Sequence, residues 1–166
     1  SARTVATQSL NIFGDHSDVY ACRQTGFAML CETNPQEVMD LSPVAHLATI
    51  EGKVPFINFF DGFRTSHEIQ KIEKWDYADL KEMCNMDAVA AFRAHALNPE
   101  HPAMRGSHEN GDVFFQHREA CNTAYNELPA IVEKYMGKIN EKLGTDYDLF
   151  NYYGAADADR VIVAMG

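Results

Sequence analysis

The sequence predicts an α/β fold that contains part of a parallel sheet. Residues 54–60 form an uncharged apolar stretch that is typical of a buried strand. A shorter apolar run over residues 26–31 predicts a second strand, and the segment between them has apolar residues at helical spacing. A strand, a helix and a strand in this order form a βαβ unit, which implies parallel strands and a right-handed crossover.

A helix start follows the first of these strands. Asn34 has a capping side chain, Pro35 fits the first helical position, and Glu37 lies three residues after the cap. This helix is expected to continue to about residue 50 and to end at residues 52–53. Pro43 lies inside the helix and is expected to bend or break it.

The remaining segments are predicted from the same signals. The first half has a mostly irregular stretch over residues 1–16 and a short helix capped by Ser17. The second half has helices at 76–85 and 86–97, a long irregular loop at 103–116 and a long helix at 117–143 that Pro129 interrupts or splits in two. A linker over 148–159 then leads to a β-branched strand over 160–166. The chain lacks an initiator Met and closes on this strand-like run, so we expect an internal piece of a longer polypeptide.

Composition excludes several classes of protein. An apolar fraction of 46% excludes an intrinsically disordered chain. The net charge of −10, from 24 acidic and 14 basic side chains, argues against nucleic-acid binding. No apolar run approaches the ~20 residues of a membrane span. The four cysteines form no close pair, so we expect reduced structural thiols in a cytoplasmic protein.

Two arginines are candidates for binding an anionic ligand. Ligands of open parallel sheets gather beyond the carboxyl ends of the strands, and Arg64 follows the strand at residues 54–60. Arg3 lies among small polar residues near the start of the chain. The planar guanidinium suits a carboxylate, although a structural ion pair is the commoner role for such residues. We expect Arg64 to shape the edge of the domain or an interdomain contact.

Other polar groups favour structural roles. His67 and Glu68 lack the second His of a zinc helix, and His117 with Cys121 lacks a third ligand, so packing or surface roles are favoured. Asp15, His16 and Asp18 are typical of a solvated loop before a helix more than of a cation site. The sequence has no P-loop, G-x-G-x-x-G or G-x-S-x-G motif.

Four stretches together resemble one family. Residues 11–30, 54–73, 98–102 and 160–166 are similar to the pyruvate:ferredoxin (flavodoxin) oxidoreductases, and the resemblance covers essentially the whole chain in order. It implies that residues 1–147 are the C-terminal part of a thiamine-diphosphate-binding, pyrimidine-type parallel-sheet domain. Residues 148–166 would then be a linker and the first strand of a second, Rossmann-like domain.

The resemblance also implies an activity for the full-length enzyme. Members are large, homodimeric, oxygen-sensitive enzymes of anaerobic metabolism that carry thiamine diphosphate, Mg²⁺ and [4Fe-4S] clusters. They convert pyruvate and coenzyme A to acetyl-CoA and CO₂ and reduce ferredoxin or flavodoxin. Arg3, in a Ser-Ala-Arg context, occupies the place of the family's substrate-binding arginine and would hold the pyruvate carboxylate.

The family's other active-site parts would lie outside this chain. These are the glutamate that activates the aminopyrimidine, the diphosphate and Mg²⁺ site, and the cluster cysteines. The piece alone is therefore expected to be inactive and poorly soluble. Two alternatives remain, a subunit of a related 2-oxoacid oxidoreductase and a non-catalytic α/β interaction module.

Overall fold

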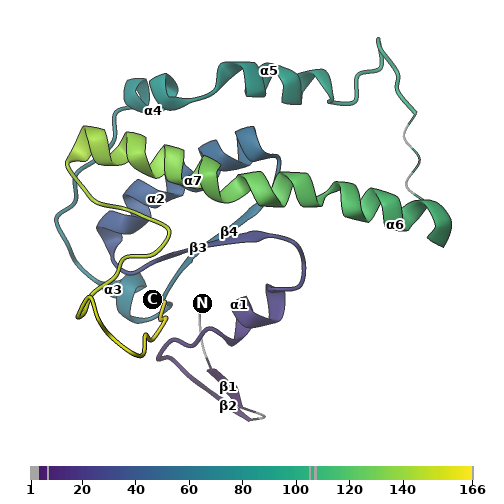
Figure 1. Ribbon diagram of the computed structural model, residues 1–166. Coiled ribbons are helices and arrows are strands. Elements are labelled where there is room, and N and C mark those ends of the chain that lie inside the picture. The colour runs from purple at the N-terminus through teal and green to yellow at the C-terminus, as the bar shows by residue number, and fades with distance from the viewer. Residues whose placement is uncertain (1–3, 7, 105, 107, 166) are drawn as a thin grey trace.

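The computed structural model describes residues 4–6, 8–104, 106 and 108–165 and shows a mixed α/β fold (Figure 1). The strands are β1 (Thr4–Ala6), β2 (Ser9–Asn11), β3 (Ala28–Glu32) and β4 (Phe56–Phe60). The helices are α1 (Ser17–Cys22), α2 (Pro35–Gly52), α3 (Arg64–His67), α4 (Tyr77–Met83), α5 (Met86–Ala94), α6 (Gly111–Ala120) and α7 (Asn122–Leu143).

The predicted βαβ unit is confirmed. β3 and β4 pair in parallel, in a register that runs from Ala28 beside Phe56 to Glu32 beside Phe60, and α2 makes the crossover between them. Because side chains alternate along a strand, Ala28 and Leu30 share one face of β3 with Glu32. Ala28, Leu30 and Phe56 pack against the core, so this face is the one that α2 covers.

The predicted start and end of α2 are also confirmed. The side chain of Asn34 accepts a hydrogen bond from the backbone N–H of Glu37 at 3.0 Å, and Glu37 Oε2 accepts one from the N–H of Thr33 at 2.7 Å. The helix ends at Lys53, whose φ of 57° is left-handed. Pro43 does not break α2, since the burial of the helix beyond it outweighs one lost hydrogen bond.

The core lies between the β3–β4 pair, α2 and α7. Figure 1 shows α7 crossing beside α2, with α4 and α5 along the opposite side from the strands. Tyr135 and Ile139 of α7 are fully buried with Val44 of α2. Asp40 of α2 is also fully buried, and its carboxylate accepts hydrogen bonds from Trp75 Nε1 at 3.0 Å and the hydroxyl of Tyr147 at 2.8 Å. These bonds fix two distant loop segments to the crossover helix.

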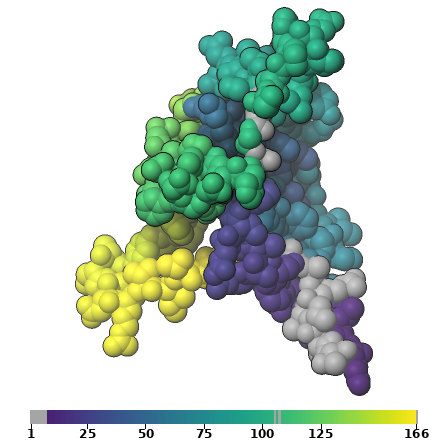
Figure 2. Space-filling model, turned by 90° about the vertical axis from the view of Figure 1, so that its right-hand side faces the viewer, coloured from purple at the N-terminus to yellow at the C-terminus, as the bar shows by residue number. Residues whose placement is uncertain are grey.

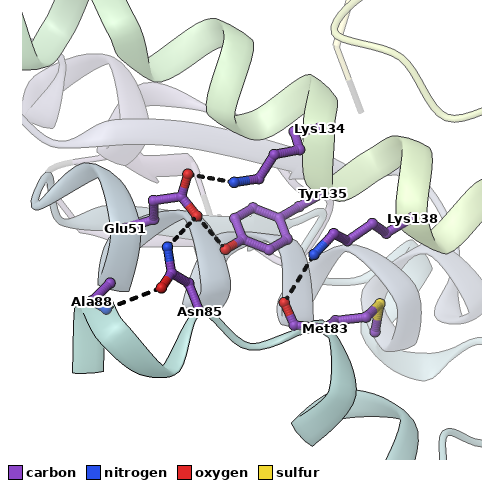
Figure 3. Close-up of polar contacts among 7 residues, drawn as sticks. All are labelled: Glu51, Met83, Asn85, Ala88, Lys134, Tyr135 and Lys138. Carbon is purple, nitrogen blue, oxygen red and sulfur yellow. Dashed lines mark hydrogen bonds and ion pairs between the residues drawn. The ribbon is translucent and has the colours of Figure 1, made fainter. Parts of the chain in front are cut away.

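A second polar cluster ties the end of α2 to α7 (Figure 3). Glu51 accepts hydrogen bonds from the hydroxyl of Tyr135 at 2.6 Å and from Asn85 at 3.2 Å, and it forms an ion pair with Lys134. These bonds lower the pKa of Glu51 to about 2, Lys134 contributing most. Lys138 donates to the carbonyl of Met83 at 3.2 Å, so α4 is held to the same part of α7.

Three predictions differ from the structure. The stretch over residues 1–16, predicted as mostly irregular, includes an antiparallel hairpin of β1 and β2 among its described residues, which are 4–6 and 8–16. Ser17 is not the cap of α1: it is the first helical residue, and Asp15 Oδ1 accepts its N–H at 3.0 Å. The predicted loop at 103–116 ends early, since α6 begins at Gly111.

The C-terminal half differs in two further ways. α6 and α7 are separate helices, but the break is at Cys121, and α7 continues through Pro129. Residues 160–165 form no strand in the part of the chain that the structure describes. Their β-branched side chains are exposed, and a strand forms only where a neighbouring strand takes its backbone hydrogen bonds.

All four cysteines are free thiols, as predicted. Among the described residues, no helix combines the length and apolar character that crossing a membrane requires.

Candidate functional site

The candidate site is the edge of the sheet where β3 and β4 end. At this edge Glu32 closes β3, and Asp61 follows β4 directly. The loop between β2 and α1, residues 12–16, meets the same edge, because Gly14 lies against Asp61. We call this set of residues the carboxyl edge. It matches the position at which parallel sheets bind ligands.

Gly14 and Asp61 form the closest approach at the carboxyl edge. A Cβ atom on Gly14 would lie 1.7 Å from Asp61 Oδ1, so no larger residue fits without displacing that carboxylate. Asp61 Oδ2 in turn accepts the backbone N–H of Arg64 at 2.8 Å, which fixes the start of α3. One carboxylate therefore sets the positions of both loops at this edge.

Aromatic rings connect the same loops. The ring of Phe13 meets that of Phe63 edge-on at 5.2 Å, and Phe63 lies 5.6 Å from His67. On the face of the sheet that points away from α2, the ring of His16 meets that of Phe59 edge-on at 5.6 Å. His16 Nδ1 is buried and has no hydrogen-bond partner in the described part of the chain.

Glu32 is the most unusual residue of the carboxyl edge. Its side chain is 0% exposed, and neither carboxylate oxygen has a hydrogen-bond partner among the described residues. Burial raises the pKa of Glu32 to about 8; its own backbone N–H and the amide of Asn58 oppose this rise, and Glu37 adds to it. The neighbouring Cys31 is affected in the same way, since burial, Glu32 and Glu37 raise its pKa to about 11. A thiol with such a pKa is a poor nucleophile at neutral pH.

The structure describes only one of the two candidate arginines. Arg3 lies outside the described residues, so its role stays a prediction. Arg64 is the first residue of α3, and its side chain is exposed at the carboxyl edge. Its backbone N–H donates to Asp61 at the edge of the domain, and its predicted interdomain contact stays a prediction.

The weaker candidates take part in local contacts. His67 shares a 2.8 Å hydrogen bond with the hydroxyl of Ser66. His117 pairs with Glu109, and the thiol of Cys121 donates to the carbonyl of His117 at 3.3 Å. Among the described residues, no group of three or more His, Cys, Asp or Glu is arranged to hold a metal ion.

Sequence reasoning missed the central features of this edge. Glu32 resembles a surface acid at the end of a strand, and its burial arises from tertiary contacts. Gly14 lay within a recognised motif, but its contact with Asp61 joins segments that are far apart in the sequence. The one local signal was the charge of Glu32 directly after an apolar run.

Comparison with known proteins identifies the family. A family model described as "Pyruvate flavodoxin/ferredoxin oxidoreductase, thiamine diP-bdg" matches residues 1–137. The chain belongs to this family. The resemblance found in the sequence is thereby confirmed, and the mixed α/β fold with parallel β3 and β4 is consistent with the thiamine-diphosphate-binding domain of this oxidoreductase family.

Curated relatives of this oxidoreductase family match over the entire chain. The pyruvate-flavodoxin oxidoreductases of Enterobacter agglomerans and Klebsiella pneumoniae are 62% and 61% identical over all 166 residues. The pyruvate:ferredoxin oxidoreductase of Moorella thermoacetica is 55% identical over the same length. The chain spans only 14% of the length of each of these relatives.

The described residues do not form a complete site for thiamine diphosphate. A bound diphosphate needs Mg²⁺ with oxygen ligands, and the described part of the chain holds no such ligand cluster.

Proposed function

We propose that this chain is part of an enzyme that oxidatively decarboxylates pyruvate with coenzyme A to acetyl-CoA and CO₂. Electrons would pass to ferredoxin or flavodoxin. The observation that carries this proposal is the match to the family model together with identity of 62% along the whole chain. The relatives reported above all have pyruvate in their names, which favours this substrate over another 2-oxoacid.

The proposal extends to the organisation of the full-length enzyme. Thiamine diphosphate, Mg²⁺ and [4Fe-4S] clusters would be bound with residues outside this chain, in a cytoplasmic homodimer. Residues 1–147 would belong to the pyrimidine-binding domain, and residues 148–166 would lead into the next domain. In support, the described residues after Thr145 form neither helix nor strand, as expected of a connection.

Arg3 is the residue that we propose to bind substrate. Its guanidinium would hold the pyruvate carboxylate by charge-assisted hydrogen bonds and so orient the keto carbon for attack. The next residue, Thr4, pairs with Asn11 in the β1–β2 hairpin. That hairpin leads directly into the loop that carries Gly14 to the carboxyl edge, which supports a role near this edge.

The rest of the polypeptide would cover the apolar surface of this piece. Figure 2 shows the N-terminal hairpin and the C-terminal segment projecting from the same end of the molecule, away from α5. The large side chains near these projections are open to solvent: Phe13 is 63% exposed, Tyr153 86% and Ile162 92%. Such a surface is typical of a piece that packs against further domains.

The proposed function is tested by anaerobic, coenzyme-A-dependent reduction of a viologen dye with pyruvate. We expect the full-length protein to be active and Arg3→Ala to raise the pyruvate KM by about 100-fold, from loss of a charge-assisted pair of about 3 kcal/mol. Arg93→Ala, which removes an exposed arginine of α5, is the matched control and should leave KM unchanged.

Each result has a distinct meaning. If pyruvate KM is unchanged in Arg3→Ala while the wild type is active, Arg3 is not the carboxylate anchor but the family activity stands. If cofactor-loaded wild type oxidises another 2-oxoacid in preference to pyruvate, the substrate assignment fails. If it oxidises none, the enzyme proposal fails and an assembly role replaces it.

A further inference from the structure

Glu32 carries an inference that goes beyond the proposed reaction. It is a carboxyl group that is fully buried at the junction of β3, α2 and α3, and neither oxygen is hydrogen-bonded within the described residues. An ionised carboxylate in such a place loses its hydration, and its own backbone N–H and the amide of Asn58 offset only part of that loss, whereas the protonated acid loses far less. The folded junction therefore favours the protonated form of Glu32 over the ionised form.

Burial and the charge of Glu37 disfavour an ionised Glu32, and together they outweigh its own backbone N–H and the amide of Asn58, which favour the charged form. On its own strand the neighbour is Cys31, and from α2 the carboxylate of Glu37 acts on it. From β4 the nearby group is the neutral amide of Asn58, which donates to the hydroxyl of Ser42 at 2.9 Å. No Lys or Arg of the described residues contributes to the charge balance at Glu32.

Helix α3 closes the junction from the remaining side. The hydroxyl of Thr65, which is buried, donates to the carbonyl of Thr33 at 3.3 Å, next to Glu32 in the chain. This bond joins the connection after β4 to the connection after β3. An ionised Glu32 would favour an opening of this junction that lets water reach the carboxylate.

We propose that Glu32 is a proton-dependent latch, which holds the carboxyl edge closed when protonated and favours its opening when ionised. The pKa of Glu32 in the folded state is about 8, against an ordinary value of 4.5. A raised carboxyl pKa means that the closed state binds the proton more tightly than the open state. Closure is therefore favoured at low pH, weakens as pH rises between about 4.5 and 8, and changes no further above that range.

The latch is tested by hydrogen exchange of the full-length protein, followed by mass spectrometry. Peptides that span β3 and the start of α2 report on the junction, after correction for the intrinsic pH dependence of exchange. In the wild type, protection of these peptides should fall by up to roughly tenfold per pH unit between pH 6 and 8. Glu32→Gln and Glu32→Met, neither of which ionises, should both remove this dependence. Glu133→Gln, at an exposed position on α7, is the matched control and should behave as the wild type.

Two results would overturn the latch. One is the same pH dependence in the wild type and both Glu32 variants. The other is a flat wild-type profile with a loss of protection at every pH in both variants, which would show that a cation elsewhere in the polypeptide pairs with an ionised Glu32. Neither result depends on pyruvate turnover, so the latch and the proposed function can fail separately.

Discussion

At the scale of single residues, Gly14 and Asp61 show how one missing side chain positions the candidate site. Asp61 occupies the space that a Cβ atom on Gly14 would need, and the same carboxylate holds the N–H of Arg64. Glycine is therefore required at this position because no side chain fits beside Asp61. It lets the loop after β2 rest directly on the loop after β4.

Replacing Gly14 with alanine should be destabilising. The new methyl group would displace Asp61 and break its bond to Arg64, so we expect a loss of about 1–3 kcal/mol, in the range of overpacked sites. Differential scanning of the full-length protein should show a lowered first transition. Gly111→Ala is the control, because nothing lies within 4 Å of a Cβ atom there. Equal melting of the two variants would contradict the steric argument.

At the scale of elements, the connection between α2 and α7 depends on Glu51. Its carboxylate is bonded to Lys134 and Tyr135 of α7 and to Asn85 before α5. The pKa of Glu51 is lowered from 4.5 to about 2, so the folded state favours the charged form. The stabilising effect is fully present above about pH 4.5 and is lost as pH falls towards 2.

Glu51→Gln should therefore be less stable than the wild type at neutral pH, by about 1 kcal/mol because Lys134 is partly exposed. The difference between the two proteins should shrink as the pH is lowered from 5 to 3. Urea unfolding of the full-length proteins across this range measures it. A difference that does not vary with pH would show that packing, and not the charge of Glu51, is responsible.

How far the sequence predicted these elements depended on whether their signals are local. The cap at Asn34 and the apolar runs of β3 and β4 are local, so α2 and both strands were predicted correctly. The β1–β2 hairpin has strands of only three residues, too short for an alternation to appear. The break at Cys121 has no Gly or Pro to mark it, whereas Pro129 lies in a helix that packing keeps intact. The buried state of Glu32 arises from tertiary contacts and has no counterpart in sequence spacing.

At the scale of the whole molecule, the exposed apolar surface indicates dependence on the rest of the polypeptide. The chain spans 14% of its relatives, and large apolar side chains are exposed along α5, α6 and the C-terminal segment. The β3–β4 pair alone also leaves strand edges without partners in the described part of the chain.

The 166-residue piece should consequently self-associate when it is produced alone. Unpaired strand edges and apolar patches favour aggregation at micromolar concentration. Light scattering after size-exclusion chromatography measures this, with the full-length protein as the control. A monodisperse piece that melts in one cooperative transition would show that these strand edges and apolar patches do not need to be buried by the rest of the polypeptide.

The packing of α7 on α2 has a consequence for synthesis on the ribosome. Glu51 and Tyr135, which bond to each other across this contact, are 84 residues apart in the sequence. At about 5–20 residues per second, α2 leaves the ribosome several seconds before the helix that will cover it. During that interval its apolar face is open to chaperones and to neighbouring nascent chains, so the rate of translation influences how much of this domain reaches its native packing.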